Sequence, residues 1–182
     1  TILSGEIGAV GIGDNSLHVV NAGGADGTAI LDGVVIRDGY ANGGGMDSYG
    51  GGILVQSGSP RFANCEVVAN FASYGGGAFF NGTSPSFIGC TFRQNSSGSF
   101  GAGIMFAGGS PVIDGCLFEE NTTSSDGGGM WIANTTITIR NSRFLRNSAA
   151  SGAAVRLNNP ATVTLTGCEF SGNSVINSGG AL

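Results

Sequence analysis

The most reactive side chains of the sequence are four cysteines, which recur at regular intervals. Cys65, Cys90 and Cys116 are 25 and 26 residues apart, Ser142 follows after 26 more, and Cys168 after another 26. Cysteines in an exported protein favour disulfides, and grouped cysteines can bind a metal. If each repeat forms one coil, however, these side chains stack about 4.8 Å apart, beyond the ~3.5–4.5 Å that a disulfide requires. We therefore expect buried free thiols, with a disulfide or a metal site as the alternatives.

Carboxylates are the other groups that could do chemistry. Hydrolysis or elimination on a polysaccharide requires clustered carboxylates, often with Ca²⁺, and a basic Lys or Arg. Here the twelve acids are dispersed, Lys is absent, and only Glu119 and Glu120 are adjacent, where strand geometry turns them to opposite faces. Surface ion pairs explain the six charged residues expected on one outer face, which are Glu66, Arg93, Asp114, Glu119, Arg140 and Arg143. We expect no catalytic residue, no cofactor and no metal site, and a structural role for His18, the single histidine.

Composition excludes several kinds of partner. The 182 residues carry a formal net charge of −5, only 10% of them are charged, and the seven basic residues are all Arg without a basic run. Phosphate binding needs clustered cations, so a nucleic-acid partner and attraction to anionic lipid are not expected. No apolar run reaches the ~18 residues of a membrane span, so no direct membrane insertion is expected.

A repeat of about 26 residues must position these groups. Its clearest marker is a column of asparagines with spacings of 25, 26, 26 and 26 residues, namely Asn70, Asn95, Asn121, Asn147 and Asn173. Three residues before each stands an apolar residue, namely Val67, Phe92, Phe118, Phe144 and Phe170. Six residues before each stands Gly or Asn, which tolerate the positive φ of a sharp corner, namely Asn64, Gly89, Gly115, Asn141 and Gly167.

These columns predict an all-β fold, a single-stranded parallel β-helix of about seven coils in which like residues stack. The asparagines should then form a buried amide ladder. We predict one β-helix domain over residues 1–182, with irregular early coils over 1–28 and regular coils over 50–182. Between them, 29–49 should form a coil with a loop protruding at 40–49. The repeat has no clean start or cap, and we expect the chain to be a fragment of a longer protein.

A second predicted strand of each coil carries a row of large side chains at its middle position. Alternation along a strand places this position outside when its neighbours point into the core. The row is therefore predicted to be an exposed stripe and a candidate interaction surface, since contiguous exposed apolar patches mark interfaces. The alternative is cover by a loop or a flanking domain. The row consists of Leu54, Phe79, Met105, Trp131 and Arg156.

Two short motifs recur in the coils. One is Phe-x-x-Asn, as in Phe92–Asn95, and the other is Gly-Gly before a small or aliphatic pair, as in Gly76–Phe79. Over residues 29 to 182 these motifs resemble the repeats of polymorphic outer-membrane proteins and, more widely, the pectin-lyase-like right-handed β-helices. The resemblance implies a right-handed coil and an extracellular or cell-surface bacterial location, often as an adhesin. Val67 and Ser142 depart from the motif columns.

Two functions of different classes follow from this pattern. The first is a non-catalytic extracellular structural or binding solenoid of a bacterial surface or secreted protein, adhesin- or stalk-like. Its partners would be a protein or glycan surface ligand and the neighbouring coils or domains of the parent chain. The second is a carbohydrate-active β-helix, lyase- or hydrolase-like, whose catalytic coils lie outside this fragment.

Overall fold

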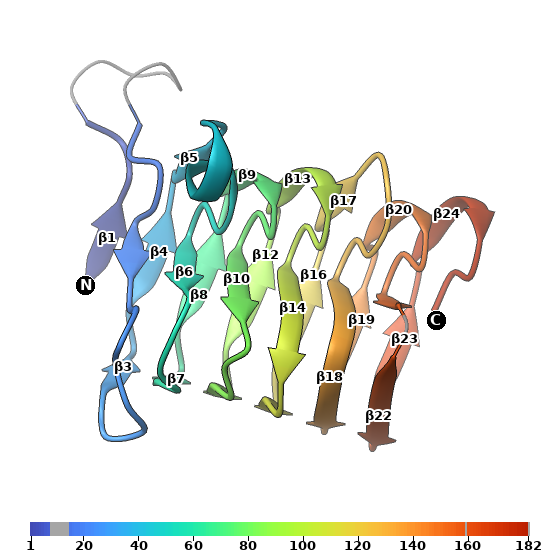
Figure 1. Ribbon diagram of the computed structural model, residues 1–182. Helices are drawn as coiled ribbons and strands as arrows, with labels where there is room; N and C mark the ends of the chain where they lie inside the picture. The colour runs from blue at the N-terminus through green and yellow to red at the C-terminus, as the bar shows by residue number, and fades with distance from the viewer. Residues whose placement is uncertain (8–14, 159, 182) are drawn as a thin grey trace.

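The chain folds into a solenoid of short parallel strands in a computed structural model that describes residues 1–7, 15–158 and 160–181 (Figure 1). Each coil contributes one strand to each side, and a strand pairs with its equivalent one coil later. Phe92 pairs with Phe118, Phe118 with Phe144, and Phe144 with Phe170. The register therefore confirms the parallel β-helix of about 26 residues per coil.

The strands of the described residues form three sheets. A seven-stranded sheet contains β1 (Ile2–Ser4), β4 (Val35–Arg37), β8 (Glu66–Val68), β12 (Thr91–Arg93), β16 (Leu117–Glu119), β19 (Arg143–Leu145) and β23 (Glu169–Ser171). A six-stranded sheet contains β5 (Tyr40–Ala41), β9 (Phe71–Tyr74), β13 (Ser96–Phe100), β17 (Thr122–Thr123), β20 (Ser148–Ser151) and β24 (Ser174–Ser178).

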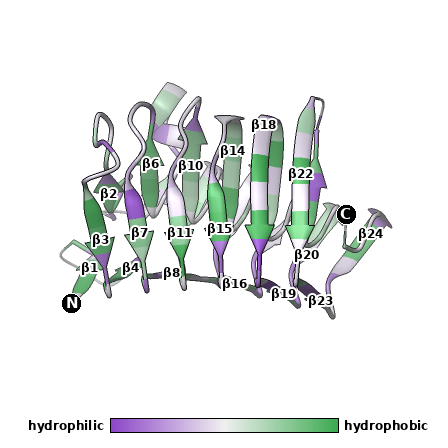
Figure 2. Ribbon diagram, turned by 90° about the horizontal axis from the view of Figure 1, so that it is seen from below, coloured by the Kyte–Doolittle hydropathy of each residue, from purple (hydrophilic) through white to green (hydrophobic). Residues whose placement is uncertain are grey.

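The third sheet consists of two series of strands joined by the long strand β18 (Met130–Arg140). One series is β2 (Val20–Asn21), β6 (Ile53–Val55), β10 (Ala78–Asn81), β14 (Ile104–Gly109) and β21 (Val155–Leu157). The other is β3 (Ile30–Asp32), β7 (Arg61–Ala63), β11 (Ser86–Ile88), β15 (Val112–Asp114) and β22 (Ala161–Thr166). Hydrophobic and hydrophilic residues alternate along β18 and β22, because one face of each strand points inward (Figure 2).

The interior is filled by stacked aromatic rings. Phe92, Phe118, Phe144 and Phe170 lie face to face with centroids 5.0, 4.7 and 5.0 Å apart. Such ladders bury a large apolar area and hold neighbouring coils in register. Phe92, Phe118 and Phe144 are completely buried, whereas Phe170 in the last described coil is partly exposed.

Left-handed backbone conformations form the corners. The predicted Gly/Asn column has positive φ throughout, from 50° at Asn64 to 63° at Gly115 and Gly167. A second corner lies directly before each asparagine of the ladder. The sequence did not predict it, because most residues there are neither Gly nor Asn. Ala69, Gln94, Glu120 and Arg146 have φ between 53° and 56° there. This conformation costs roughly 1–2 kcal/mol per residue, so the adjoining turn must stabilise it.

The first coils contain short strands and a loop. β1 pairs with β4, and β2 pairs with β6, so early strands do precede the regular coils. Tyr40 and Ala41 pair with Phe71 and Ala72, and the loop therefore begins after β5 rather than at residue 40. A short 3₁₀ turn, η1 (Gly45–Ser48), lies in this loop and projects beside β5 (Figure 1).

Candidate functional site

The predicted stripe on the outside of β6, β10, β14 and β18 is not exposed. Leu54, Phe79, Met105 and Trp131 retain only 2, 4, 7 and 8% of their accessible surface. They do point away from the main core, but they form a second apolar cluster of their own. Only Arg156 is half-exposed, and its Nε lies 3.8 Å from Asp126 Oδ2. The prediction of an exposed apolar surface was therefore wrong.

Aromatic residues from the preceding corner cover this second cluster. Tyr49, Tyr74 and Phe100 are at equivalent positions of successive coils, as their backbone pairing shows. Tyr49 packs on Phe79 with centroids 4.5 Å apart, and Phe100 stacks on Trp131 at 5.3 Å and 18°. The cover comes from the chain itself, so the row provides no argument for an external partner.

The asparagine ladder is confirmed at every step. The Nδ2 of Asn95 donates to Oδ1 of Asn121 at 3.0 Å, and Nδ2 of Asn121 donates to Oδ1 of Asn147 at 2.9 Å. The ladder starts at Asn70 and ends at Asn173 with bonds of the same length. From Asn95 onwards each Oδ1 also accepts the backbone N–H of the preceding asparagine, as at Asn95 N, 3.1 Å from Asn121 Oδ1, and Asn70 Oδ1 accepts that of Gly39. The ladder therefore satisfies the turn backbone that follows the strained corner.

The four cysteines lie in the predicted column as free thiols. Cys65, Cys90 and Cys116 are buried and Cys168 is half-buried. Ser142 replaces a cysteine in this column, and its Oγ accepts the backbone N–H of Cys116 at 3.1 Å. A hydrogen bond with the Cys116 thiol and burial raise the pKa of Cys90 to about 12. The pKa of Cys65 is also raised, first by its hydrogen bond with Cys90 and then by burial. The pKa of Cys116 is lowered, chiefly by the hydrogen bond that Cys116 forms with Cys90.

Acidic side chains on the solvent side are paired with arginines of the neighbouring coils. Arg93 Nε pairs with Glu66, Arg140 Nε lies 3.0 Å from Asp114 Oδ2, and Arg143 Nε lies 2.7 Å from Glu169 Oε2. Arg146, rather than Arg143, binds Glu119 and also Glu120. Asn141 and then Arg140 lower the pKa of Asp114. These ion pairs agree with the ion-pair interpretation of the charged outer face.

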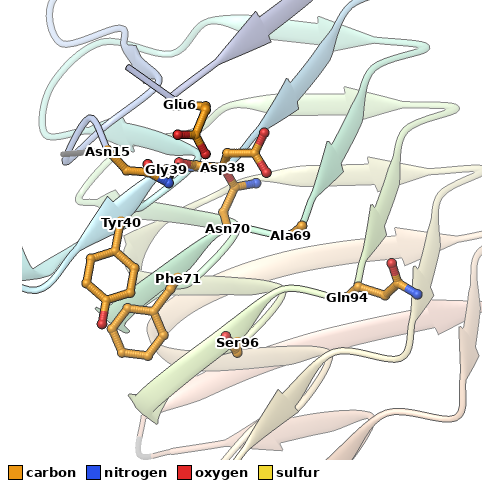
Figure 3. Close-up of a pocket in the computed structure, with 10 residues that line it drawn as sticks. All are labelled: Glu6, Asn15, Asp38, Gly39, Tyr40, Ala69, Asn70, Phe71, Gln94 and Ser96. Carbon is orange, nitrogen blue, oxygen red and sulfur yellow. Dashed lines mark hydrogen bonds between the residues drawn. The ribbon is translucent and has the colours of Figure 1, made fainter. Parts of the chain in front are cut away.

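A hollow of about 460 Å³ lies across the first coils, where the sequence analysis placed no site (Figure 3). It has two carboxylates, Glu6 and Asp38, at one side and the stacked rings of Tyr40 and Phe71 at another. Its ten lining residues are Glu6, Asn15, Asp38, Gly39, Tyr40, Ala69, Asn70, Phe71, Gln94 and Ser96. Mostly apolar walls with a few polar groups are typical of small-molecule sites.

Two small residues border this hollow, and each is stacked on a larger residue of the preceding coil. In the corner column Ala69 stands between Asp38 and Gln94. In the six-stranded sheet Ser96 follows Tyr40 and Phe71. These small residues could be recognised in the sequence once the register was known. The irregular first coil, however, obscured that register.

The polar groups of the hollow are acceptors for the most part. Asp38 Oδ2 receives hydrogen bonds from Arg37 Nε at 2.5 Å and Ser4 Oγ at 3.1 Å. Glu6 is exposed and makes no ion pair within the described residues. Asn15 Nδ2 donates to the backbone oxygen of Asp38 at 2.8 Å and ties residue 15 to the corner. The Asn70 amide is already used by the ladder.

His18 lies at the edge of the early coils, where its Nδ1 is 3.1 Å from the backbone oxygen of Gly50. Among the residues that the structure describes, no three His, Cys, Asp or Glu side chains are grouped so that they could hold a metal ion. Nor does this part of the chain contain a helix long and apolar enough to span a membrane.

Comparison with known proteins identifies the family. Residues 15–182 match the family described as the right-handed β-helix region. Comparisons with curated proteins and with solved structures found no match. The match covers nearly the whole solenoid, including every regular coil, and it agrees with the stacked parallel strands. The chain therefore belongs to the right-handed β-helix family.

Proposed function

We propose that the chain is a non-catalytic structural and binding solenoid of a bacterial surface or secreted protein, with an adhesin- or stalk-like role. A right-handed β-helix fits either a structural and binding protein or a carbohydrate-active one, because one fold hosts many functions. The choice between them must therefore rest on the side chains.

The pairing of acids with arginines is the observation that favours the non-catalytic role. A glycosidase or lyase needs two carboxylates, or a carboxylate and a base, that are free to exchange protons with a substrate. On the seven-stranded sheet Glu66, Glu119 and Glu169 each pair with an arginine of an adjacent coil. A carboxylate that is bound to an arginine is not free to exchange protons with a substrate, because the ion pair would first have to break.

The bacterial surface location rests on the recurring motifs. The Phe-x-x-Asn and Gly-Gly motifs, seen at Phe118–Asn121 and Gly128–Gly129, resemble the repeats of polymorphic outer-membrane proteins. A long rod held by backbone ladders and stacked rings suits a stalk, since each coil contacts only its neighbours and stiffness is distributed along the axis.

The experiment is an activity assay with the purified chain. Polygalacturonate, alginate and neutral β-glucans are incubated with it, with and without Ca²⁺, and reducing ends and unsaturated products are measured. We expect no product above a heat-denatured control. Product formation above this control would contradict the non-catalytic role. Protease treatment of intact source cells, followed by detection with an antibody against the chain, tests the surface location.

A further inference from the structure

The hollow of the first coils has the features of a ligand site, and we propose that it binds a neutral saccharide unit whose ring stacks on Phe71. This inference rests on the binding role proposed above and names the ligand class for it. It is carried by three observations: an uncovered aromatic face, carboxylate acceptors at the rim, and a lining without cations.

The aromatic face results from the end of a stack. Tyr40 and Phe71 lie 4.8 Å apart at 25°, so Tyr40 covers one face of the Phe71 ring. The next residue of the column is Ser96, and no other ring of the described chain stacks on Phe71. Gly98 lies beside the Phe71 ring, since a Cβ added at Gly98 would be 4.0 Å from Phe71 Cζ. Ser96 and Gly98, which carry no bulky side chain, therefore border the face of Phe71 that Tyr40 does not cover.

The rim supplies partners for hydroxyl groups. Glu6 is an exposed carboxylate that forms no salt bridge within the described residues. Gln94 also borders the hollow, but its amide already accepts from Arg93 Nη1 at 3.1 Å and donates to Glu120 Oε2 at 3.2 Å (Figure 3). Carboxylates accept hydrogen bonds from hydroxyls, and such charge-assisted bonds are stronger than neutral ones. A sugar ring combines an apolar face with a periphery of hydroxyls, which is the chemistry that this combination recognises.

Charge selects among saccharides. The lining contains Glu6 and Asp38 but no Lys, Arg or His, and Arg37 binds Asp38 from outside the hollow. A uronate or sulfated sugar would bring its own negative charge towards two carboxylates, and Arg37, which also attracts Glu6, is already bound to Asp38. The hollow therefore favours a neutral sugar over an acidic one.

Filling the space above Phe71 tests the proposal. Ser96→Phe continues the aromatic column that Tyr40 and Phe71 begin, so the coil should accept it while the ring face is lost. Ser148→Phe is the matched control, because Ser148 occupies the same column two coils later and is also half-buried. Circular dichroism and the thermal midpoint confirm that both variants fold.

Binding is measured by saturation-transfer NMR and calorimetry with neutral gluco-, manno- and galacto-oligosaccharides, and with oligogalacturonate as the acidic counterpart. We expect the wild type and Ser148→Phe to bind one neutral series, and Ser96→Phe to bind it about tenfold more weakly or worse. Equal binding by Ser96→Phe, binding of no neutral series, or stronger binding of oligogalacturonate would each overturn the proposal. Cleavage of any of these sugars would instead overturn the proposed non-catalytic function.

Discussion

Asn95 and Asn121 are joined by two hydrogen bonds to one oxygen. Asn121 Oδ1 accepts both the Nδ2–H of Asn95 at 3.0 Å and its backbone N–H at 3.1 Å. The Nδ2 of Asn121 in turn donates to the backbone oxygen of Phe92 at 2.9 Å. One side chain therefore satisfies two buried donors and one buried acceptor of the preceding coil, next to a corner with positive φ.

Asn121→Ala should lower the free energy of unfolding by about 2–4 kcal/mol, because two donors of Asn95 lose their acceptor in a buried site. Urea denaturation monitored by circular dichroism measures this change. Thr122→Ala, at the exposed neighbouring position, is the control and should change stability by less than about 0.5 kcal/mol. Equal effects of the two substitutions would contradict a structural role for the ladder.

Phe79→Ala and Trp131→Ala should each destabilise the fold by about 2–4 kcal/mol, because both side chains fill the second apolar cluster under Tyr49 and Phe100. If these side chains formed an exposed stripe, as the sequence alone predicted, the substitutions would leave stability almost unchanged. Ile176→Ala is the control, since Ile176 is 85% exposed. Thermal denaturation measures all three variants, and an unchanged midpoint for Trp131→Ala would mean that the aromatic cover contributes nothing.

The thiols should differ in reactivity according to burial. In denaturant without reductant, four equivalents of a thiol reagent should react, because the four cysteines are free. In the native protein Cys168 should react first, since it is only half-buried, and Cys65, Cys90 and Cys116 should react much more slowly. Mass spectrometry of partly labelled protein locates the modified residue. Early labelling of Cys90 would be incompatible with a closed column.

Stability should fall at alkaline pH because of the same column. The pKa of Cys90 is raised to about 12 and that of Cys65 is raised further, both from an ordinary value of 9.0. Above pH 9 the unfolded chain loses these protons while the native state keeps them, so ionisation favours the unfolded state. The contribution is fully present below pH 9 and is lost progressively as the pH rises above it.

The double variant Cys65→Ser/Cys90→Ser isolates this effect from tyrosine ionisation, and Ser142 shows that serine is accepted in the column. Denaturation at pH 7 and pH 10 should show a smaller loss of stability for the variant than for the wild type. Parallel pH profiles for the two proteins would rule out the thiols as the cause.

The sequence by itself determined the repeat and its interior. Asn70 to Asn173 and the phenylalanines before them recur at one spacing, and only stacking of like on like accounts for this. Gly and Asn at the first corner were readable because few residues adopt a positive φ at low cost. The second corner at Gln94 and Glu120 was not readable, since the ladder that stabilises its backbone lies in other coils.

Only the tertiary structure decided what lies outside the sheets. Alternation along a strand predicts that the Trp131 side chain points away from the main core. It does not predict which residues cover that side chain. Phe100 closes over Trp131 from the preceding coil, and this contact depends on how two corners stack. The hollow beside Phe71 likewise exists because Ala69 and Ser96 align with larger residues of adjacent coils. Periodicity determines the position of a residue within its coil. Exposure and cavities depend instead on the residues stacked above and below it. Those residues are known only when the register of every coil is known.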